Sequence, residues 1–412
     1  MSKVQRRAGA GFSLRVRRHS GRVRRYHVRC LPPDFPAWTV ERHGTPQARW
    51  YVMAPQLPGH GGFVAIFDAH GAPVWWRRSP SADVMPWDAK LLGHGLLAWA
   101  TNFGDHFGVR QESAYEAHAL NGRLVRRIRT SGSPTDVHDL QPMGNGHFLG
   151  LTYRRRENVD LSAYGGQEHA TVFDGEVQEL TPGGKVVWRW NSRDRISPSE
   201  TSRAWWYYPE FADSHPPAER GYDLQHLNSV EPDGNGVVVS GRHVNAVYRI
   251  DRATGRVDWK LGGSYVAGES LTVVPAPSGP LLGGQHDARV LADGTLTVFD
   301  NRSRTGGAPA AKRFRIDPVA RTAKLIETVT EPDVPEAEWG GSARRLPGGN
   351  WVIGWGGTNL VTEQTATGAV VLALRFGGDY VTYRAQPLLP GALHASELRH
   401  GMDHMAKRPA GP

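Results

Sequence analysis

The sequence has one cysteine, Cys30, among 412 residues, so no disulfide can form within the chain. Disulfides are rare in reducing compartments, and we therefore expect a cytoplasmic protein. No run of about 18 apolar residues occurs, which excludes a transmembrane helix. Arg6 and Arg7 form a twin-arginine pair, but an export signal needs an apolar segment after it, and further arginines follow instead. We expect no signal peptide.

Acidic side chains are absent from residues 1–30, which contain Lys3 and nine arginines. The other 39 of the 49 basic residues are balanced by 40 acidic ones, so the basic charge belongs to an N-terminal arm, residues 1–49. A basic arm can contact nucleic acid or another acidic partner, but this one lacks the interleaved aromatic residues that stack on bases. We interpret it as a partly disordered leader or an edge hairpin that turns at Ser20 and Gly21. We expect neither a nucleic-acid nor a membrane partner.

Helical periodicity is almost absent, whereas 49 glycines and 29 prolines punctuate short apolar runs. Two hairpin patterns alternate along the chain. In the first, an apolar run leads through an acidic residue and a glycine-bearing turn to Val and Trp, as at 66–75 and 250–259. In the second, the turn is Gly followed by Asn, His or Thr, as at 144–151 and 233–240. The stretch 222–263 holds the most complete copy of both patterns.

Each pair of hairpins makes a four-stranded antiparallel sheet. Five complete pairs start near residues 86, 137, 226, 286 and 341. The stretch 51–77 holds half of a sixth pair, and Tyr380–Arg384 can supply its missing strand. This arrangement predicts an all-β fold, a six-bladed β-propeller whose last blade is closed by both termini, because closure removes exposed sheet edges. We place the propeller at residues 50–390 and a tail at 391–412, with a short helix around Leu393–Met405.

Polar side chains recur at one position of the repeat. When the hairpin turns are aligned, His286 matches His226, and His138 matches Asn228. These residues start the innermost strand of their blades, so we predict that three consecutive blades direct them at one mouth of the central channel. Arg242 lies at the same end of its hairpin.

Aromatic residues offer further candidates. Trp87 occupies the matching position of another blade and is predicted to line the same mouth. The insertion at residues 193–221 contains Trp205, Trp206 and Tyr207, which we interpret as a lid or wall for an aromatic ligand, or as side chains that pack on the rim.

The site residues limit the chemistry. They include no carboxylate pair for glycoside hydrolysis, and the chain has neither a P-loop nor a Gly-x-Ser-x-Gly elbow. Arg and His donors suit a sulfate or phosphate group, and a neutral His can attack sulfur or phosphorus. Three imidazoles could also bind a divalent metal, as in propeller lyases and lactonases. Asp139 and Asp287 each follow a His and face the other way along the strand, so we expect turn or supporting roles for them.

Several segments together resemble the arylsulfotransferase family of aryl-sulfate sulfotransferases. They are His138–Leu140, Gln225–Val230, Val238–His243, Tyr248–Gly255, Trp259–Gly263, Gln285–Ala288 and Leu296–Asn301. The resemblance covers roughly residues 50–380 and implies a six-bladed propeller. It also implies transfer of a sulfuryl group from a phenolic sulfate ester to a phenol through a sulfohistidine, without a nucleotide donor. We expect no cofactor and no metal.

The resemblance assigns roles to the candidate residues. His286 matches the nucleophile, and His138 matches a further site histidine. Arg242, His226 and Asn228 match the residues that hold the sulfuryl oxygens and assist the leaving group. We expect Trp205, Trp206, Tyr207 and Trp87 to contact small phenolic substrates.

The chain departs from the well-known bacterial members, which are exported, carry a disulfide and have an additional N-terminal β-domain. Two other functions therefore stay open. The same scaffold could perform acid–base or metal-assisted chemistry on an aromatic secondary metabolite, such as a cyclisation, rearrangement or hydrolysis. Alternatively, a non-catalytic propeller could bind a partner through its rim and basic arm, although that role needs no imidazoles in the channel. We expect a monomer or a homodimer.

Overall fold

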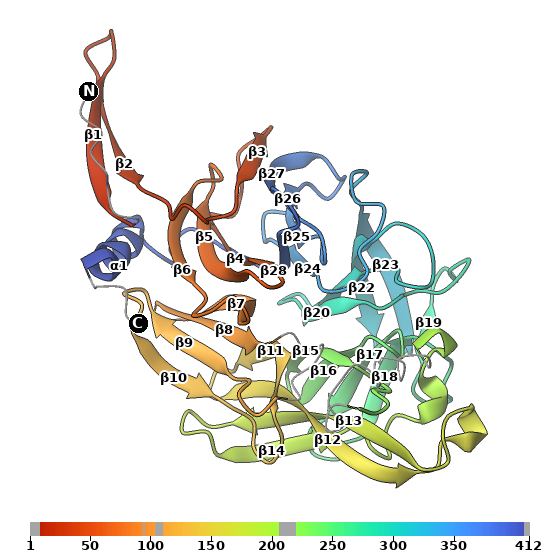
Figure 1. Ribbon diagram of the computed structural model, residues 1–412. Helices are drawn as coiled ribbons and strands as arrows, with labels where there is room; N and C mark the ends of the chain where they lie inside the picture. Colours follow the sequence, from red (N-terminus) through yellow and green to blue (C-terminus); the bar gives the residue numbers. More distant parts are fainter. Residues whose placement is uncertain (1–8, 94, 104–109, 206–219, 408–412) are drawn as a thin grey trace.

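The structure is a computed structural model that describes residues 9–93, 95–103, 110–205 and 220–407. Six small antiparallel sheets are arranged as the blades of a β-propeller around a central channel (Figure 1). The predicted all-β, six-bladed fold is confirmed. Within the described ranges, no helix is long and apolar enough to cross a membrane.

The blades are numbered in the order in which the chain passes through them, and the strands of each are given from the channel outward. Blade 1 contains β28 (Val381–Leu388), β4 (Trp50–Leu57), β5 (Gly61–Asp68) and β6 (Pro73–Arg78). Blade 2 contains β7 (Met85–Gly93), β8 (Leu96–Asn102), β9 (Tyr115–Ala119) and β10 (Leu124–Ile128). Blade 3 contains β11 (Thr135–Pro142), β12 (Phe148–Val159), β13 (Ala170–Leu180) and β14 (Val186–Asn191).

The other three blades follow the same plan, and two of them gain an outer strand. Blade 4 contains β15 (Leu227–Asp233), β16 (Gly236–Gly241), β17 (Ala246–Asp251) and β18 (Val257–Gly262). Blade 5 contains β20 (His286–Val290), β21 (Thr295–Asp300), β22 (Ala310–Asp317), β23 (Thr322–Val329) and β19 (Thr272–Val273). Blade 6 contains β24 (Ser342–Arg345), β25 (Trp351–Gly354), β26 (Leu360–Gln364), β27 (Val370–Phe376) and β3 (Trp38–Arg42).

Strand alternation explains how each blade is held between its neighbours. Every residue of β16 is buried, and successive side chains point to opposite faces of the sheet. Val237 and Val239 pack with Leu149 of blade 3, whereas Val238 packs with Leu296 of blade 5. An uninterrupted apolar run of this kind therefore marks a strand covered on both faces.

Both ends of the chain contribute to the closure. Strand β28 pairs antiparallel with β4, with Leu388 opposite Trp50, so the predicted closure of one blade by both termini is confirmed. Strand β3 adds a fifth strand to blade 6 by pairing with β27. It lies within the range that the sequence pattern assigned to the arm, because a mostly exposed edge strand gives no apolar alternation to detect.

The terminal segments meet beside blade 1. Strands β1 (Gly11–Arg17) and β2 (Val23–Arg29) form a separate two-stranded hairpin. Helix α1 (Ala395–Lys407) is the helix expected near the C-terminus, and its Leu398 and Met402 are buried against the core that contains Trp75. Gly401 is required there, since a Cβ would lie 2.3 Å from the carbonyl oxygen of Leu120. Three short 3-10 helices, Ser162–Tyr164, Pro198–Glu200 and Arg203–Trp205, lie in connections.

Charged side chains fill the centre of the channel. Arg384 of blade 1 is 3% exposed and reaches four other blades. Its guanidinium lies 3.0 Å from Asp88 and 3.5 Å from Asp287, and donates to the carbonyl oxygens of His138 at 2.9 Å and Asn228 at 2.6 Å. Burial of these charges is tolerated because each is paired.

The remaining cations of this network reach the same carboxylates. Lys90 and Arg289 lie 2.7 Å and 2.8 Å from Asp139, and Arg344 lies 2.7 Å from Asp287. Burial by itself would raise the pKa of Asp139, but Arg289, Lys90 and Arg384 hold it well below its ordinary value. Asp139 and Asp287 thus support the channel, in agreement with the roles expected for them.

We predict that Arg384→Met destabilises the protein by about 3–5 kcal/mol, because it leaves buried carboxylates without their cation. Chemical denaturation measures this change. The matched control is Arg375→Met, which removes a cation 2.8 Å from Asp333 in a pair whose side chains are 37% and 68% exposed. It should cost less than about 1 kcal/mol. Equal losses in the two variants would contradict the assigned role of the network.

Candidate functional site

One residue of each blade faces the channel at the same level. These residues are Trp87, His138, Asn228, His286, Gly341 and Tyr383, and we call them the channel ring. A repeated hydrogen bond between blades fixes the equivalence of the last five, because the residue after a ring position accepts from a backbone N–H of the next blade; Trp87 stacks on Tyr383 at 4.6 Å. The bonds are Val230 N–H to Asp139 at 2.9 Å, Ala288 N–H to Ser229 at 3.0 Å, Ala343 N–H to Asp287 at 3.1 Å and Ala385 N–H to Ser342 at 3.0 Å.

This pattern corrects the sequence alignment. His286 is equivalent to Asn228, not to His226, while the match of His138 with Asn228 holds. The reason is the length of the turn. Hairpin β15–β16 turns directly after Asp233, which pairs with Gly236, whereas β20–β21 needs the longer connection between Val290 and Leu296. His226 lies one residue before β15, with a left-handed φ of 49°.

The tautomer of His286 is set by Asn301. The Asn301 amide nitrogen donates to the carbonyl oxygens of Ala337 and Gly340, each at 2.9 Å, so its oxygen faces His286. His286 Nδ1 lies 2.8 Å from that oxygen and must carry the proton. The lone pair is therefore on Nε2, which accepts a hydrogen bond from the Gly340 N–H at 3.3 Å.

Electrostatics keep His286 neutral. Burial, followed by the positive charge of Arg242, holds its pKa well below the ordinary value, and the hydrogen bond to Asn301 only partly opposes this. Gly341 has a φ of 106° and lies against the Phe299 ring, which a Cβ at this position would approach to 2.2 Å. His286 is thus a neutral imidazole with a defined lone pair in the channel.

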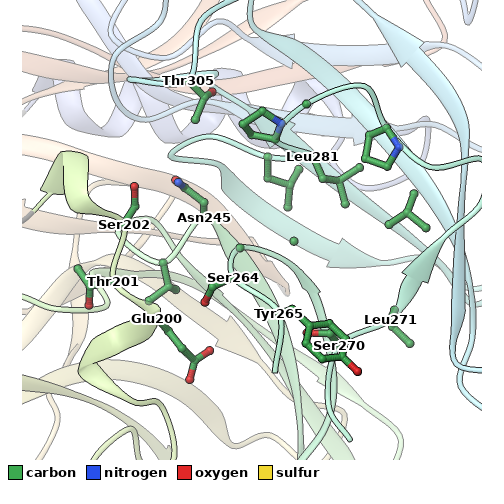
Figure 2. Close-up of a pocket in the computed structure, with 18 of the residues that line it drawn as sticks. Glu200, Thr201, Ser202, Asn245, Ser264, Tyr265, Ser270, Leu271, Leu281 and Thr305 are labelled. Carbon is green, nitrogen blue, oxygen red and sulfur yellow. The ribbon is translucent and has the colours of Figure 1, made fainter. Parts of the chain in front are cut away.

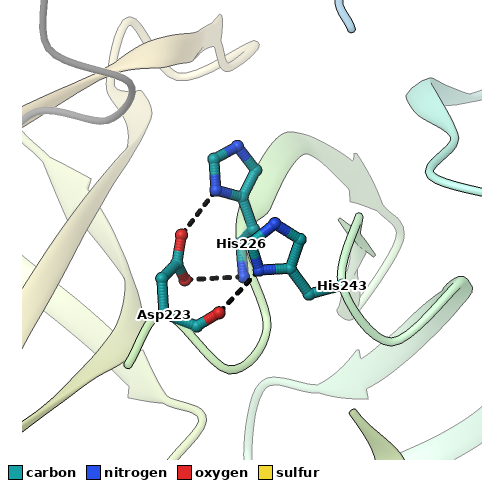
Figure 3. A group of neighbouring side chains, drawn as sticks. All are labelled: Asp223, His226 and His243. Atoms are coloured by element: carbon teal, nitrogen blue, oxygen red, sulfur yellow. Dashed lines mark hydrogen bonds and ion pairs between the residues drawn. The ribbon is translucent and has the colours of Figure 1, made fainter. Parts of the chain in front are cut away.

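His226 belongs to a buried cluster with Asp223 and His243 (Figure 3). Asp223 accepts from the His226 backbone N–H at 2.9 Å, and its other oxygen lies 2.5 Å from His226 Nδ1. The carbonyl oxygen of Asp223 accepts from His243 Nδ1 at 2.6 Å. Burial raises the pKa of Asp223 to about 6, and burial also lowers the pKa of His243 well below its ordinary value. One aspartate therefore orients two imidazoles.

This cluster is the set of described residues that comes closest to a metal site. The three ligand atoms lie within 4.8 Å of one another. However, both Nδ1 atoms face acceptors on Asp223, and His243 Nε2 lies 3.4 Å from an Arg242 nitrogen. A cation held there would meet the guanidinium, so the geometry favours a hydrogen-bonded cluster over a metal centre.

His138 forms a second aspartate–histidine pair. Its Nδ1 lies 3.0 Å from both carboxylate oxygens of Asp136, and Asp136 Oδ1 also accepts from the His138 backbone N–H at 2.8 Å. The His138 ring centroid is 4.8 Å from that of His226 and 5.8 Å from that of Tyr383. The His286 ring lies 6.2 Å from Tyr383. The three predicted histidines therefore gather at one point.

Arg242 is held by Trp205 and Glu338. Its guanidinium carbon lies 4.2 Å from the Trp205 ring centroid and its Nη2 donates to the Glu338 carbonyl oxygen at 2.8 Å. Trp205 is 2% exposed, stacks on His243 at 4.7 Å, and also receives Arg304 at 4.3 Å. The structure thus places Trp205 behind Arg242, as a support for the guanidinium. Trp206 and Tyr207 lie outside the described residues.

Four buried polar atoms of this region have no hydrogen-bond partner among the described residues. They are Asn228 Oδ1, Arg242 Nε, Trp87 Nε1 and Tyr383 Oη. Buried polar atoms are nearly always paired, so a group of unpaired ones marks where a ligand or water binds. Asn228 also keeps a second amide N–H, because its Nδ2 uses only one for the Gln285 carbonyl oxygen at 2.7 Å.

Aromatic rings form one wall of the site. Trp87 stacks between Trp339 at 5.6 Å and Tyr383 at 4.6 Å, with interplanar angles of 6° and 20°. Burial raises the pKa of Tyr383 well above its ordinary value, so its phenol stays protonated. Trp87 thus lies at the predicted mouth, and its contact with substrate stays a prediction.

A cavity of about 720 Å³ lies beside the site (Figure 2). Its lining includes Glu200, Asn245, Tyr265 and Arg304, but none of the channel ring. It adjoins the site through Arg304, whose guanidinium rests on Trp205. The catalytic candidates are therefore not in this cavity.

Sequence reasoning missed five residues of the site, namely Asp136, Asp223, His243, Asn301 and Tyr383. Asp136 and Asp223 stand two and three residues before a predicted histidine, a spacing that a search for carboxylate partners of imidazoles could have found. His243 follows Arg242 directly. Asn301 and Tyr383 come from a distant part of a blade or from the closing strand, and no local pattern connects them with the site.

The chain was compared with known proteins. The sequence profile of the arylsulfotransferase (ASST) family matches residues 111–377, more than half of the chain. No curated protein sequence is significantly similar. Among solved structures, a protein of unknown function from Bacteroides caccae is 11% identical, with 83% of this chain and 99% of that chain covered and a TM-score of 0.49.

Two other solved structures are more distant in shape. A putative 6-phosphogluconolactonase from Bacteroides fragilis is 11% identical over 84% of this chain and 99% of that chain, with a TM-score of 0.43. The glutaminyl cyclase of Myxococcus xanthus is 15% identical over 63% of this chain and 88% of that chain, with a TM-score of 0.30. Likenesses this low carry no information about chemistry. The profile match does, and it supports a sulfotransferase-type function: the chain belongs to the arylsulfotransferase family.

Proposed function

We propose that this protein is an aryl sulfotransferase that moves a sulfuryl group from a phenolic sulfate ester to a phenolic acceptor, with His286 as the nucleophile. The observation that carries the proposal is the state of His286. Its Nδ1 proton is committed to Asn301 and its pKa is held low by burial and Arg242, so Nε2 offers a lone pair at neutral pH.

In the first half-reaction, His286 Nε2 attacks the sulfur of the aryl sulfate. An N–S bond forms as the S–O bond to the aryl group breaks, and the phenolate leaves with the electron pair. The positive charge that develops on the imidazole is stabilised by the Asn301 oxygen on Nδ1. In the second half-reaction, the acceptor phenol loses its proton and attacks sulfur, the N–S bond breaks, and His286 regains its lone pair.

The sulfuryl oxygens need donors that are already in place. Arg242 offers Nε, and Asn228 and Tyr383 offer an amide N–H and a phenol O–H that no described residue accepts. Trp205 and the Glu338 carbonyl oxygen hold the Arg242 guanidinium, so little reorganisation is needed as charge develops. This arrangement favours a trigonal or tetrahedral oxyanion at the channel ring.

Proton transfer is assigned to the two aspartate–histidine pairs. In each, the carboxylate binds Nδ1, fixes the ring orientation, and stabilises the imidazolium that forms when the other nitrogen takes a proton. His226 and His138 can then protonate the departing phenolate and deprotonate the acceptor. His286 has an amide as its hydrogen-bond partner, whereas His226 and His138 have carboxylates. This difference distinguishes the proposed nucleophile from the proposed acid–base groups.

The same two pairs favour a second candidate function. Acid–base chemistry on an aromatic metabolite, such as a rearrangement or cyclisation, needs paired imidazoles and an aromatic wall, and no covalent intermediate. Trp87 and Tyr383 supply that wall. The two candidates differ in whether His286 becomes sulfated.

We predict that incubation with 4-nitrophenyl sulfate and phenol releases nitrophenol, and that the protein transiently gains the mass of one sulfuryl group. In His286→Ala, both signals should fall by at least about 100-fold, because the nucleophile is absent. Intact-mass spectrometry and absorbance measure them. The control is His147→Ala, a half-buried histidine that contacts Glu179 in a blade 3 turn.

Added chelator should leave this activity unchanged. A mass gain that persists in His286→Ala would remove that residue as the nucleophile. Inertness toward every aryl sulfate tested, in a folded protein, would favour the second candidate.

We predict that Asp223→Asn lowers kcat about 100-fold and removes an acid limb near pH 6 from the pH profile, because protonation of Asp223 ends its support of His226. As pH falls through about 6, the activity of the wild type should fall while its free energy of unfolding rises. Since burial raises the folded-state pKa of Asp223, the wild type gains stability as pH falls through about 6, and the variant lacks this gain. Rates and thermal unfolding between pH 5 and 8 test both signs. An unchanged acid limb in the variant would assign that limb to another group.

A further inference from the structure

The N-terminal hairpin is amphipathic and stands away from the propeller (Figure 1). In its register, Leu14 pairs with Tyr26 and Val16 with Arg24, so these four side chains share one face. Leu14, Val16 and Tyr26 are 46%, 45% and 45% exposed. We call this surface the apolar face of the hairpin.

The opposite face and the tip are basic. Arg15 pairs with Arg25 on that face, and Arg17 and Arg18 lead into the turn. Residues 15–25 contain six arginines in all and no acidic residue. The hairpin therefore combines an exposed apolar surface with a dense positive charge around it.

Contacts with the rest of the protein are confined to the base of the hairpin among the residues that the structure describes. Arg29 lies 2.7 Å from Asp403 of α1, and Gly9 donates to the Cys30 carbonyl oxygen at 2.7 Å. A two-stranded ribbon is only marginally stable alone in water, and exposed apolar side chains on it indicate a partner. The base fixes the hairpin to the body, while the tip and its apolar face remain uncovered.

We propose that this hairpin binds the surface of a bilayer that contains anionic phospholipids. The apolar face would lie at the boundary between headgroups and acyl chains, and the arginines would bind lipid phosphates. The hairpin would lie along the membrane surface and would not cross the bilayer. Such binding differs from the expectation of no membrane partner, which rested on sequence features that report spanning segments.

The same features disfavour other occupants. Nucleic acid would use the arginines but leave Leu14, Val16 and Tyr26 in water. A second copy could cover the apolar face, but stacking two hairpins brings their arginines together without acidic residues to balance them. Beyond residues 1–30, the chain has 39 basic and 40 acidic residues and so an excess of only one negative charge.

Vesicle cosedimentation with the full chain tests the proposal. Phosphatidylcholine vesicles with about 30% phosphatidylglycerol should bind at least tenfold more tightly than pure phosphatidylcholine. Arg15→Gln with Arg25→Gln should weaken binding by about 25-fold, at roughly fivefold per arginine. The triple variant Leu14→Ser, Val16→Ser, Tyr26→Ser keeps every charge and should weaken binding at least tenfold.

The matched control is Val319→Ser, which removes a 93% exposed apolar side chain from the turn between β22 and β23. It should bind like the wild type, and all variants should unfold at the same temperature because the propeller core is unchanged. Absence of vesicle binding overturns the proposal. So does wild-type vesicle binding by the triple variant, which would indicate that the arginines bind the vesicles by charge alone and that the apolar face does not contribute. Loss of self-association in the triple variant, without vesicle binding, would identify a second copy as the occupant. Binding is measured without substrate, so its failure is independent of the proposed sulfotransfer.

Discussion

The centre of this propeller depends on the ion pairs and hydrogen bonds of Arg384. It comes from the strand that closes blade 1, and its guanidinium contacts carboxylates or carbonyl oxygens of blades 2, 3, 4 and 5. Removing two carbonyl groups and three carboxylates from water is tolerated only because this cation, with Lys90 and Arg289, compensates them. The channel ring lies directly on this network, since the ring residues immediately precede Asp88, Asp139, Asp287 and Arg384 in the chain. The ring residues therefore rest on this network, whereas His226, Arg242 and Asn301 lie in the connections beside it.

Three imidazoles in one channel mouth would be chemically equivalent without their partners. Asn301 gives His286 an amide oxygen, whereas Asp136 and Asp223 give His138 and His226 carboxylates. A neutral acceptor leaves the first imidazole a nucleophile, and an ionised acceptor stabilises the protonated form of the others. This difference is the reason for the proposed roles, with His286 as the nucleophile and His138 and His226 as the acid–base groups. It also explains why the cluster around Asp223 suits hydrogen bonding better than metal binding, with Arg242 beside it.

The repeat pattern was sufficient for the architecture. Alternating hairpins, glycine turns and the incomplete half-blade at 51–77 predicted six blades and the closing role of the C-terminal strand, because an incomplete blade would leave the ring of sheets open. The pattern also predicted a shared location at one mouth of the central channel for His138, His226, His286, Asn228 and Arg242. The alignment was wrong by two residues for His286, because turn lengths differ between blades and apolar alternation with a period of two cannot detect an even shift.

The sequence by itself determined the fold, the family and the identity of the chemical groups, since these depend on local periodicity and on residue types in order. Only the tertiary structure decided which groups share a hydrogen bond. Tyr383 comes from the far end of the chain, Asn301 faces His286 across a hairpin, and Trp205 packs against the Arg242 guanidinium. The pairing in β1–β2 likewise decided that Leu14 and Tyr26 share a face. Such contacts depend on the closure of the propeller and on the register of paired strands, and no single segment of the sequence determines either.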